Sequence, residues 1–301
     1  MTKIYLISLS TLFFVNTLFS QNRKIIDVHF HSRYFDDYGI PAPKNPITGI
    51  SPIASNNDEV LKSNYTLLKK CNIVKVICSG TLNRNLEYTK KDATMFISSL
   101  EYPDHQNNSL PDTITFKKFF LEKKFSVWGE LGLQYEGKTL DDLAFEPYLK
   151  ICEKLGIPVA IHTGEAAPNT PYLCCPKFTI ASGRPLNIEP VLKKYPKLKI
   201  QLMHMGYPFL EETNALLNVY PQVYVDTSAI DWLVPKEEFY FYLKSLMTAG
   251  FGSRIMYGSD QMIWEDAIPL SIKNIEEAPF LSVLEKDNIF YNNAAKFFDV
   301  K

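Results

Sequence analysis

The sequence predicts an α/β fold, namely a single-domain (β/α)8 barrel of the TIM type. First, eight short β-rich runs alternate with helical patterns along the chain. Second, several of these runs are hydrophobic almost throughout, which is typical of strands that are covered on both faces. Third, the chain has 301 residues, and barrels of this kind usually need about 250. These observations favour one large parallel barrel.

The eight predicted strands share a run of β-branched, aromatic or other apolar residues with turn residues between the runs. In chain order they are residues 24–31, 73–80, 94–102, 125–133, 158–164, 199–206, 223–229 and 254–260. Because helical patterns separate them, the strands are expected to lie parallel.

Apolar residues at helical spacing predict helices in most of the gaps between these strands. The clearest patterns are NDEVLKSNYTLLKKC, TFKKFFLEKK, FEPYLKICEKLG, NIEPVLKKYP, FLEETNALLNVYP and KEEFYFYLKSLMTAG. Several end in KLG, KYP or TAG, which are ordinary helix stops. LNRNLEYTKK at 82–91 is a poor helix pattern, so the second βα unit is the weakest. The segment 41–57, rich in Pro, Ser and Asn, predicts a long loop at the barrel mouth.

The first 20 residues have the pattern of a secretory signal peptide. Lys3 precedes an apolar run from Ile4 to Val15, and small polar residues follow it. The run is shorter than the ~20 residues that a membrane-spanning helix needs, so no stable membrane insertion is expected once the leader is removed. The sequence therefore predicts a signal peptide at 1–20, cleaved near Ser20, and a mature barrel at 21–301 that is periplasmic or secreted.

The charge balance bears on the partners of the protein. Its 32 basic and 33 acidic side chains leave a formal net charge of -1, which gives no field to attract nucleic acid or anionic lipid. A small-molecule substrate is expected instead, and a homo-oligomer is compatible with the composition.

The five cysteines are an odd number and predict no disulfide framework. Cys71 and Cys78 fall in apolar patterns, where a buried thiol is expected. The adjacent pair Cys174 and Cys175 is only a weak signal for metal binding.

Histidines gather at the ends of the predicted strands. His29 and His31 close the run KIIDVHFH, and residues two apart on a strand point to the same face. His162 and His204 end the fifth and sixth runs, whereas His105 lies in a loop and is expected to be exposed to solvent. Since active sites of such barrels lie at the C-terminal ends of the strands, these four histidines are expected to meet.

Two carboxylates occupy similar positions. Glu130 lies in the fourth run, and Asp260 closes the eighth. Imidazole with carboxylate suits a divalent ion such as zinc. Any one of these histidines could instead be a hydrogen-bonded core residue, but independent core histidines have no reason to collect at one end of a barrel. The set therefore predicts a metal site.

With these motifs in place, the chain resembles the amidohydrolase superfamily, and within it the amidohydrolase-related branch (amidohydrolase family 2), which contains hydrolases and non-oxidative decarboxylases. The resemblance covers nearly the whole mature chain. It is carried by DVHFH at 27–31, GELGL at 129–133, GIPVAIHTG at 156–164, LMHMG at 202–206, VYVDTSA at 223–229, IMYGSD at 255–260 and DNIFYNNAAKFF at 287–298.

The resemblance implies roles for these residues. His29, His31 and Asp260 would hold the metal, with His162 as a further ligand, and Asp260 would also act as the general base. A zinc-type ion lowers the pKa of water to about 7. A carboxylate beside that water can accept its proton and pass it to the leaving group.

The number of ions depends on Glu130 and His204. Glu130 resembles the bridging glutamate of the TatD-type hydrolases, in which case His162 and His204 would bind a second ion. In the single-metal branch, His204 would orient a water or polarise the substrate as a catalytic residue, and Glu130 would form hydrogen bonds inside the barrel. One essential ion is favoured, because HMG and GSDQ look more like that branch. Two ions are the alternative.

Three further side chains are candidates for substrate binding. Arg33 and Arg184 could each clamp a substrate carboxylate with two hydrogen bonds, or be surface arginines. Trp232 follows the seventh strand and could line the pocket or pack at its rim.

The leading function is a metal-dependent hydrolase that cleaves an amide, lactone or other ester bond of a small molecule. The second is a non-oxidative decarboxylase of an aromatic or unsaturated carboxylic acid, which would use the same metal site. A third is a barrel that binds a ligand or metal without turnover, which the intact ligand set with Asp260 disfavours. A deoxyribonuclease is disfavoured by the near-neutral charge.

Overall fold

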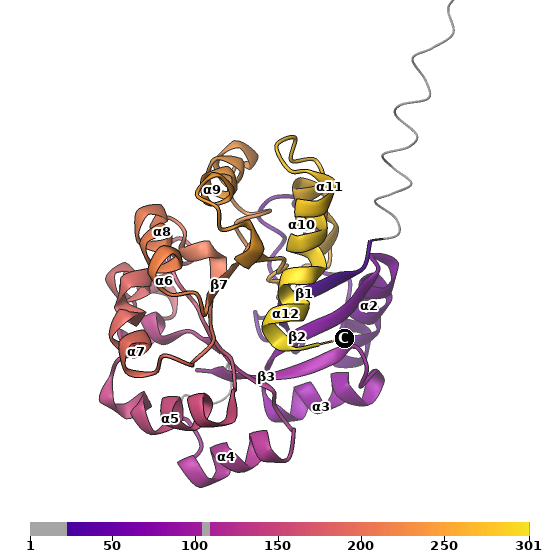
Figure 1. Ribbon diagram of the computed structural model, residues 1–301. Helices are drawn as coiled ribbons and strands as arrows, with labels where there is room; N and C mark the ends of the chain where they lie inside the picture. The colour runs from indigo at the N-terminus through magenta and orange to yellow at the C-terminus, as the bar shows by residue number, and fades with distance from the viewer. Residues whose placement is uncertain (1–22, 104–108, 301) are drawn as a thin grey trace, which may run out of the picture.

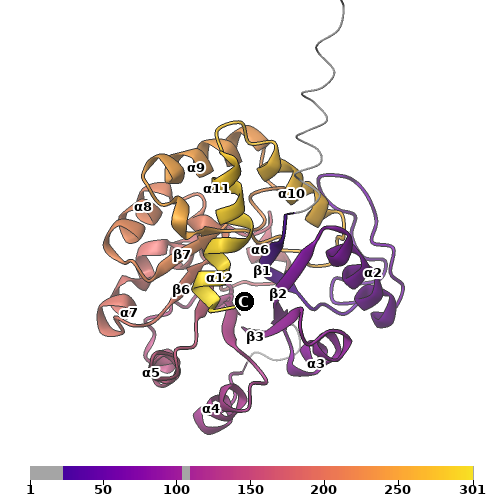
Figure 2. The ribbon, with the colours of Figure 1, turned by 45° about the vertical axis from the view of Figure 1, so that its right-hand side comes forward.

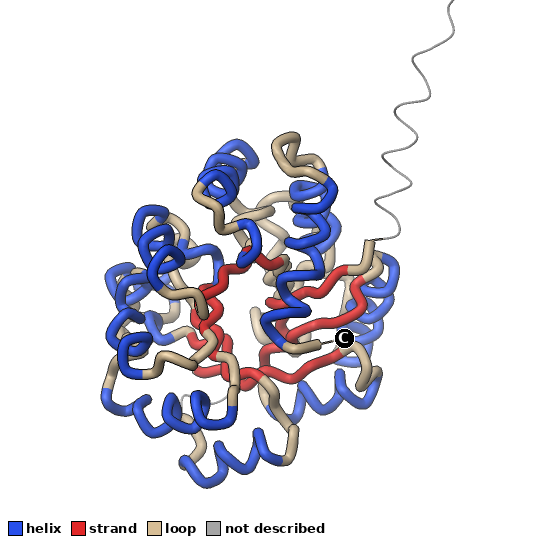
Figure 3. The backbone as a smooth tube through the Cα atoms, viewed as in Figure 1, coloured by secondary structure: helices blue, strands red, loops and turns tan. Residues whose placement is uncertain are grey.

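The computed structural model describes residues 23–103 and 109–300, which form one parallel sheet of eight strands. Each strand pairs with the next along the chain. The strands are β1 Ile25–His31, β2 Ile73–Gly80, β3 Phe96–Tyr102, β4 Val127–Leu131, β5 Val159–Ile161, β6 Ile200–Leu202, β7 Val223–Asp226 and β8 Ile255–Met256. A bridge from Phe30 to Gln261 brings the segment after the last strand back to the first. The predicted (β/α)8 barrel is confirmed (Figures 1 and 3).

Helices surround the strands on the outside (Figure 3). They are α2 Asn57–Lys70, α3 Leu82–Lys91, α4 Thr113–Leu121, α5 Glu146–Leu155, α6 Thr170–Leu173, α7 Glu189–Lys194, α8 Leu210–Val219, α9 Lys236–Thr248, α10 Ala267–Glu276, α11 Val283–Asp287 and α12 Asn293–Phe298. Every clear helical pattern in the sequence corresponds to one of them.

The strands in the second half of the barrel are shorter than the sequence predicted. The run 199–206 leaves the sheet after Leu202 and continues as the 3₁₀ turn η5 Met203–Gly206. The run 254–260 leaves it after Met256. In both runs a later residue takes the left-handed conformation, with φ of 59° at His204 and 48° at Asp260. Both residues lie beyond the last residue of their strand, and the left-handed backbone there differs from that of a strand.

The weak helical pattern at 82–91 forms the regular helix α3, which corrects the sequence-based expectation. Thr81 caps its first turn by accepting a hydrogen bond from the Arg84 backbone. The Asn85 side chain is buried and donates to the carbonyls of Gly80 and Ser99. Polar side chains thus anchor this helix in place of an apolar stripe, and these tertiary contacts outweigh the weak helical pattern.

The C-terminal helix α12 covers one end of the barrel (Figure 2). Phe297 packs its ring 4.7 Å from that of Tyr224 on β7. Ala294 and Phe297 belong to the same buried cluster as Ile26 and Val28 of β1. Those strand residues precede His29 and His31, so α12 closes the N-terminal end and leaves the histidines at the other.

The long loop after β1 folds against the loop after β8. Asn45 is buried, and its side-chain amide donates to Asp266 Oδ1 at 3.0 Å. The Trp264 indole donates to the carbonyl of Pro43 at 2.8 Å. This contact places the 41–57 segment at the C-terminal end of the barrel, as the sequence predicted.

The five cysteines comprise one disulfide-bonded pair and three free thiols. Cys174 and Cys175 form a disulfide with each other, and as a disulfide they have no thiolate with which to bind a metal ion. Cys71, Cys78 and Cys152 are free thiols; Cys78 and Cys152 are buried, whereas Cys71 is only partly so.

Two expectations fall on residues 1–22 and 104–108, outside the described residues. The signal peptide at 1–20 and the exposure of His105 therefore stay predictions. Within 23–103 and 109–300, no helix has both the length and the apolar character required to cross a membrane.

Candidate metal centre

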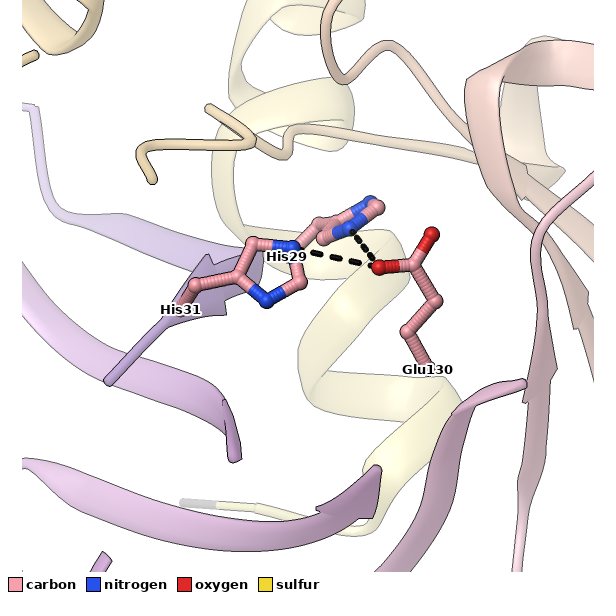
Figure 4. Close-up of side chains that lie close together, drawn as sticks. All are labelled: His29, His31 and Glu130. Atoms are coloured by element: carbon pink, nitrogen blue, oxygen red, sulfur yellow. Dashed lines mark ion pairs between the residues drawn. The ribbon is translucent and has the colours of Figure 1, made fainter. Parts of the chain in front are cut away.

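Two histidines of β1 and a glutamate of β4 meet inside the C-terminal end of the barrel (Figure 4). His29 and His31 are 0% and 1% exposed. Glu130 Oε2 lies 3.4 Å from His29 Nε2 and 3.1 Å from His31 Nε2. The alternation of a strand thus turns both rings inward, as the HxH spacing predicted.

Asp260 approaches the same two rings from the segment after β8. Its Oδ1 atom lies 3.4 Å from His29 Nε2 and 3.0 Å from His31 Nε2. The Asp260 amide donates to the His29 carbonyl at 2.8 Å. A Cβ on Gly258 would come within 2.8 Å of the His29 Cβ, so glycine allows this close approach.

His162 and His204 face the other oxygen of the same glutamate. Glu130 Oε1 lies 3.9 Å from His162 Nε2 and 3.8 Å from His204 Nε2. The two rings lie 4.5 Å apart between centroids. Glu130 therefore stands between two pairs of imidazoles, with one carboxylate oxygen toward each pair.

Ser228 and Asp226, just after and at the end of β7, fix two of the rings. The Ser228 hydroxyl donates to Asp226 and so accepts from His29 Nδ1 at 2.7 Å. His204 Nδ1 donates to the Ser228 carbonyl at 3.0 Å. In their neutral forms both rings thus carry the proton on Nδ1, which leaves the Nε2 lone pairs available to a metal ion. Asp226 was not predicted from the sequence to belong to the site. The available signal was its place at the end of a predicted strand, in the DTS of VYVDTSA.

The free nitrogens fit a metal ion. His29 Nε2 and His204 Nε2 are buried, and neither has a hydrogen-bond partner among the described residues. Buried polar atoms are nearly always satisfied, so these two call for a ligand. Three overlapping sets have ligand atoms that all lie within 4.8 Å of one another: His29, His31 and Glu130; His29, His204 and Asp260; Glu130, His162 and His204. Nitrogen and carboxylate donors of this kind suit a borderline divalent ion.

The charges of the cluster are strongly coupled. Burial disfavours the charged form of His29, but Asp260 and Glu130 outweigh it and hold its pKa well above the ordinary value. Burial also opposes the charge on His31, yet hydrogen bonds to Asp260, Glu101 and Glu130 raise its pKa to about 9. In the metal-free protein, protons on imidazoles balance the buried carboxylates.

The pKa values of Glu130, Asp260 and His162 are shifted by the same neighbours. Burial would raise the pKa of Glu130 and of Asp260, but the nearby His29 charge lowers both. Burial, and then the charge of His204, lowers the pKa of His162 to about 3. His162 is therefore neutral and ready to act as a ligand.

Tyr135 is a member of the site that sequence reasoning missed. It lies in the 3₁₀ turn η1 Leu133–Glu136, just after β4. Its hydroxyl oxygen is 3.2 Å from His162 Nε2, and the two rings meet edge to face at 5.2 Å. Burial and then the Glu130 charge raise the pKa of Tyr135 well above its ordinary value. Its position directly after a strand end was the available signal.

Arg33 lies at the edge of the cluster in a buried ion pair. It is 6% exposed and donates two hydrogen bonds to Glu101, at 2.9 Å and 2.7 Å. Glu101 Oε2 in turn lies 3.9 Å from His31 Nδ1. Burial would raise the pKa of Glu101, but Arg33 lowers it to about 2. Glu101, at the end of β3, was also missed from the sequence.

The other two predicted substrate contacts lie in different surroundings. The Arg184 side chain is 52% exposed and pairs with Glu212 at the surface. The Trp232 side chain is buried, and its indole donates to the Ser259 carbonyl at 2.8 Å, next to Asp260. The structure thus brings Arg33 to the cluster, puts Arg184 in a surface ion pair, and makes Trp232 a support for the segment after β8.

Comparison with curated proteins finds distant relatives. The chain is 27% identical over 191 residues to 2-amino-3-carboxymuconate-6-semialdehyde decarboxylase of Dictyostelium discoideum, covering 56% of this chain and 52% of the relative. It is 21% identical over 148 residues to the protein fluG of Emericella nidulans, covering 48% of this chain and 16% of that protein. The chain thus spans about half or less of the relatives' lengths.

Solved structures share the fold. An uncharacterised TIM-barrel protein of Bordetella bronchiseptica has a TM-score of 0.66 at 16% identity, covering 92% of this chain and 98% of that one. A probable 2-pyrone-4,6-dicarboxylic acid hydrolase of Acinetobacter baumannii has a TM-score of 0.63 at 15% identity, covering 92% and 99%. The manganese complex of 5-carboxyvanillate decarboxylase of Novosphingobium aromaticivorans has a TM-score of 0.61 at 14% identity, covering 93% and 97%.

The family assignment rests on a broader match. The model of the amidohydrolase family matches residues 76–300, from β2 to the end of the described chain. That range contains Glu130, His162, His204 and Asp260 of the cluster. The resemblance noted from the sequence motifs is thereby confirmed, and this chain belongs to the amidohydrolase family.

Proposed function

We propose that the protein is a metal-dependent hydrolase that cleaves an amide, lactone or other ester bond of a small molecule. The observation that carries the proposal is the meeting of Asp260 Oδ1 with two imidazole nitrogens, at 3.4 Å from His29 Nε2 and 3.0 Å from His31 Nε2. A divalent ion supplies a Lewis acid that lowers the pKa of water to about 7 and polarises a substrate oxygen.

Asp260 acts as the general base in this proposal. Its carboxylate borders the ligand nitrogens, where it can take a proton from the attacking water and later give it to the leaving group. The hydrogen bond from its amide to the His29 carbonyl holds it in place. His204 keeps a proton on Nδ1 and directs Nε2 into the site. With Nε2 unprotonated the ring can orient a water by accepting its hydrogen bond, and with Nε2 protonated it can polarise a substrate oxygen.

We propose zinc as the ion, with one essential ion held by His29, His31, His162 and Asp260. The donor set of imidazole and carboxylate supports zinc, although manganese accepts the same ligands. The position of Glu130 between two imidazole pairs supports the alternative of two ions. Elemental analysis of the purified active protein tests the count, and two tightly held ions per chain would overturn the single-ion proposal.

A decarboxylase of an aromatic or unsaturated carboxylic acid is the second candidate. It is supported by the names of a curated relative and of a similar structure, which are decarboxylases. Arg33, buried beside the cluster, is the cation that could attract a substrate carboxylate, provided that it can be shared with Glu101. Arg184 and Trp232 remain proposed substrate contacts, although the Arg184 side chain is exposed and paired with Glu212 and the Trp232 side chain is buried.

Isotope labelling separates the two reactions. The zinc-loaded protein would be incubated with lactones, amides, esters and aromatic acids in water labelled with oxygen-18 and, in parallel, in heavy water. Hydrolysis inserts one labelled oxygen into the product acid. Decarboxylation releases carbon dioxide and leaves deuterium on the carbon that carried the carboxylate. Carbon dioxide release without oxygen incorporation would overturn the hydrolase proposal.

We also propose that the mature protein is exported and periplasmic or secreted. The support is the leader-like pattern at 1–20. Amino-terminal sequencing of protein recovered from outside the cytoplasm tests this, and an intact Met1 there would contradict cleavage.

A further inference from the structure

Tyr135 is held against the cluster by its surroundings. Its ring packs 5.5 Å from that of Phe178, and its amide donates to the Gly132 carbonyl at 3.1 Å. A Cβ on Gly132 would come within 3.0 Å of the Tyr135 ring, so the glycine leaves room for it. The hydroxyl is therefore directed at His162 by packing on more than one side.

The partner of this hydroxyl is the nitrogen that faces the interior of the site. His162 Nε2 lies 3.2 Å from the Tyr135 hydroxyl and 3.9 Å from Glu130 Oε1. A neutral imidazole nitrogen offers a single lone pair. An ion that takes the lone pair of His162 Nε2 therefore ends the hydrogen bond between this nitrogen and the tyrosine hydroxyl.

The displaced hydroxyl would stay beside the ligands of the ion. A phenol is protonated at neutral pH and can donate a hydrogen bond. Glu130 and Asp260, the acidic members of the cluster whose charges act on Tyr135, are carboxylates, which only accept hydrogen bonds when they are ionised. Arg33, the cation of this group, already has two of its NH groups on Glu101.

We propose that Tyr135 is a catalytic residue whose hydroxyl moves its hydrogen bond from His162 to an oxygen of the substrate when the ion is bound. The inference rests on the proposed metal-dependent function. It applies to a carbonyl oxygen in a hydrolase and to a carboxylate or hydroxyl oxygen in a decarboxylase. In either case the donor stabilises negative charge on an oxygen in a site that is rich in carboxylates.

The test compares Tyr135→Phe with Tyr148→Phe, whose hydroxyl donates to the Pro111 carbonyl at 2.9 Å, away from the histidines. Zinc affinity is measured by competition with a chelator. Acetohydroxamate, a small oxygen ligand for zinc, is then titrated into the zinc-loaded proteins by calorimetry. We expect Tyr135→Phe to bind zinc at least as tightly as wild type but acetohydroxamate about tenfold more weakly, the effect of one lost hydrogen bond. Tyr148→Phe is expected to change neither.

Other outcomes overturn the proposal. Weaker zinc binding with unchanged acetohydroxamate binding would make Tyr135 a support for His162, and no change in either would give it no role. A spectroscopic measurement on wild type gives a second readout. The carbon-13 signal of the Tyr135 Cζ atom, identified as the one tyrosine signal that is missing from Tyr135→Phe, should shift when acetohydroxamate is added, and an unchanged signal counts against the proposal. If wild type binds no divalent ion, the proposed function itself fails, which is a distinct result.

Discussion

At the scale of single residues, the site depends on where each imidazole keeps its proton. Ser228 accepts hydrogen bonds from the Nδ1 atoms of two rings. Its hydroxyl accepts from His29, and its carbonyl accepts from His204. Asp226 in turn accepts from the Ser228 hydroxyl and amide. The end of β7 and the residues just after it therefore set the tautomer of one ring on β1 and one ring in the turn after β6.

Removing the Ser228 hydroxyl tests this role. Ser228→Ala should leave the fold intact and weaken zinc binding by about 10- to 100-fold, because the His29 ring loses the acceptor that orients it. Chelator competition measures the change, and Ser51→Ala in the exposed loop is the control. Unchanged zinc affinity would show that packing alone orients the ring.

Asp260 tests the chemistry. Asp260→Asn should lower kcat by about 10² to 10⁴ on the substrate identified by the screen, since the amide cannot take up the proton. Steady-state kinetics measure it, with the metal content of each sample determined in parallel. Asp141→Asn at an exposed position is the matched control. A near wild-type rate in the metal-loaded variant would exclude Asp260 as the base.

At the scale of elements, one end of the barrel is packed by a helix and the opposite end carries the candidate site. Helix α12 closes the N-terminal end, where Phe297 is 2% exposed and packs on Tyr224. The loops after β1, β4 and β8 build the opposite end, where the histidines lie. Helix α12 therefore contributes to the packing of the strands, whereas the loops at the other end contribute residues of the site.

A cavity under α12 should affect stability more than metal binding. Phe297→Ala is expected to lower the free energy of unfolding by about 3 to 5 kcal/mol, as is usual for a buried phenylalanine. Phe241→Ala, at a position that is 63% exposed, should change it by about 0.5 kcal/mol or less. Denaturant titration measures both. Equal losses in the two variants would contradict the role of α12 as part of the core.

At the scale of the whole molecule, protonated histidines balance the charge of the buried carboxylates in the metal-free protein. The pKa of His31 is raised to about 9 by its carboxylate neighbours, compared with about 6.5 for an unperturbed histidine. Its protonated form therefore stabilises the fold. That contribution is complete below the unfolded-state pKa and is lost as the pH rises through the folded-state value.

The stability of the metal-free protein should accordingly fall between about pH 6.5 and 9. Zinc replaces the protons, so the gain in melting temperature on adding zinc should be larger at the upper end of this window. Thermal unfolding with and without zinc at several pH values measures both effects. His31→Gln should flatten the decline in the metal-free protein. A decline of the same steepness in that variant would assign it to other groups.

Much of the fold and part of the site could be predicted from the sequence. The spacing of HxH requires both rings to share a face of one strand, and strand ends in a parallel barrel meet at one end. His29, His31, Glu130, His162, His204 and Asp260 could therefore be assigned to one cluster. The helix at 82–91 was underestimated, because its anchors are buried polar groups such as Asn85, which a search for apolar periodicity passes over.

The sequence by itself determined the order of strands and helices and the chemical kinds of ligand, because both follow from local periodicity and residue type. Only the tertiary structure decided which residues complete the site. Tyr135, Glu101 and Asp226 act through contacts with residues of other strands, while Arg33 and Arg184, alike in the sequence, differ in burial and partner. The physical reason is that burial and pairing depend on the distance between segments that are far apart in the chain.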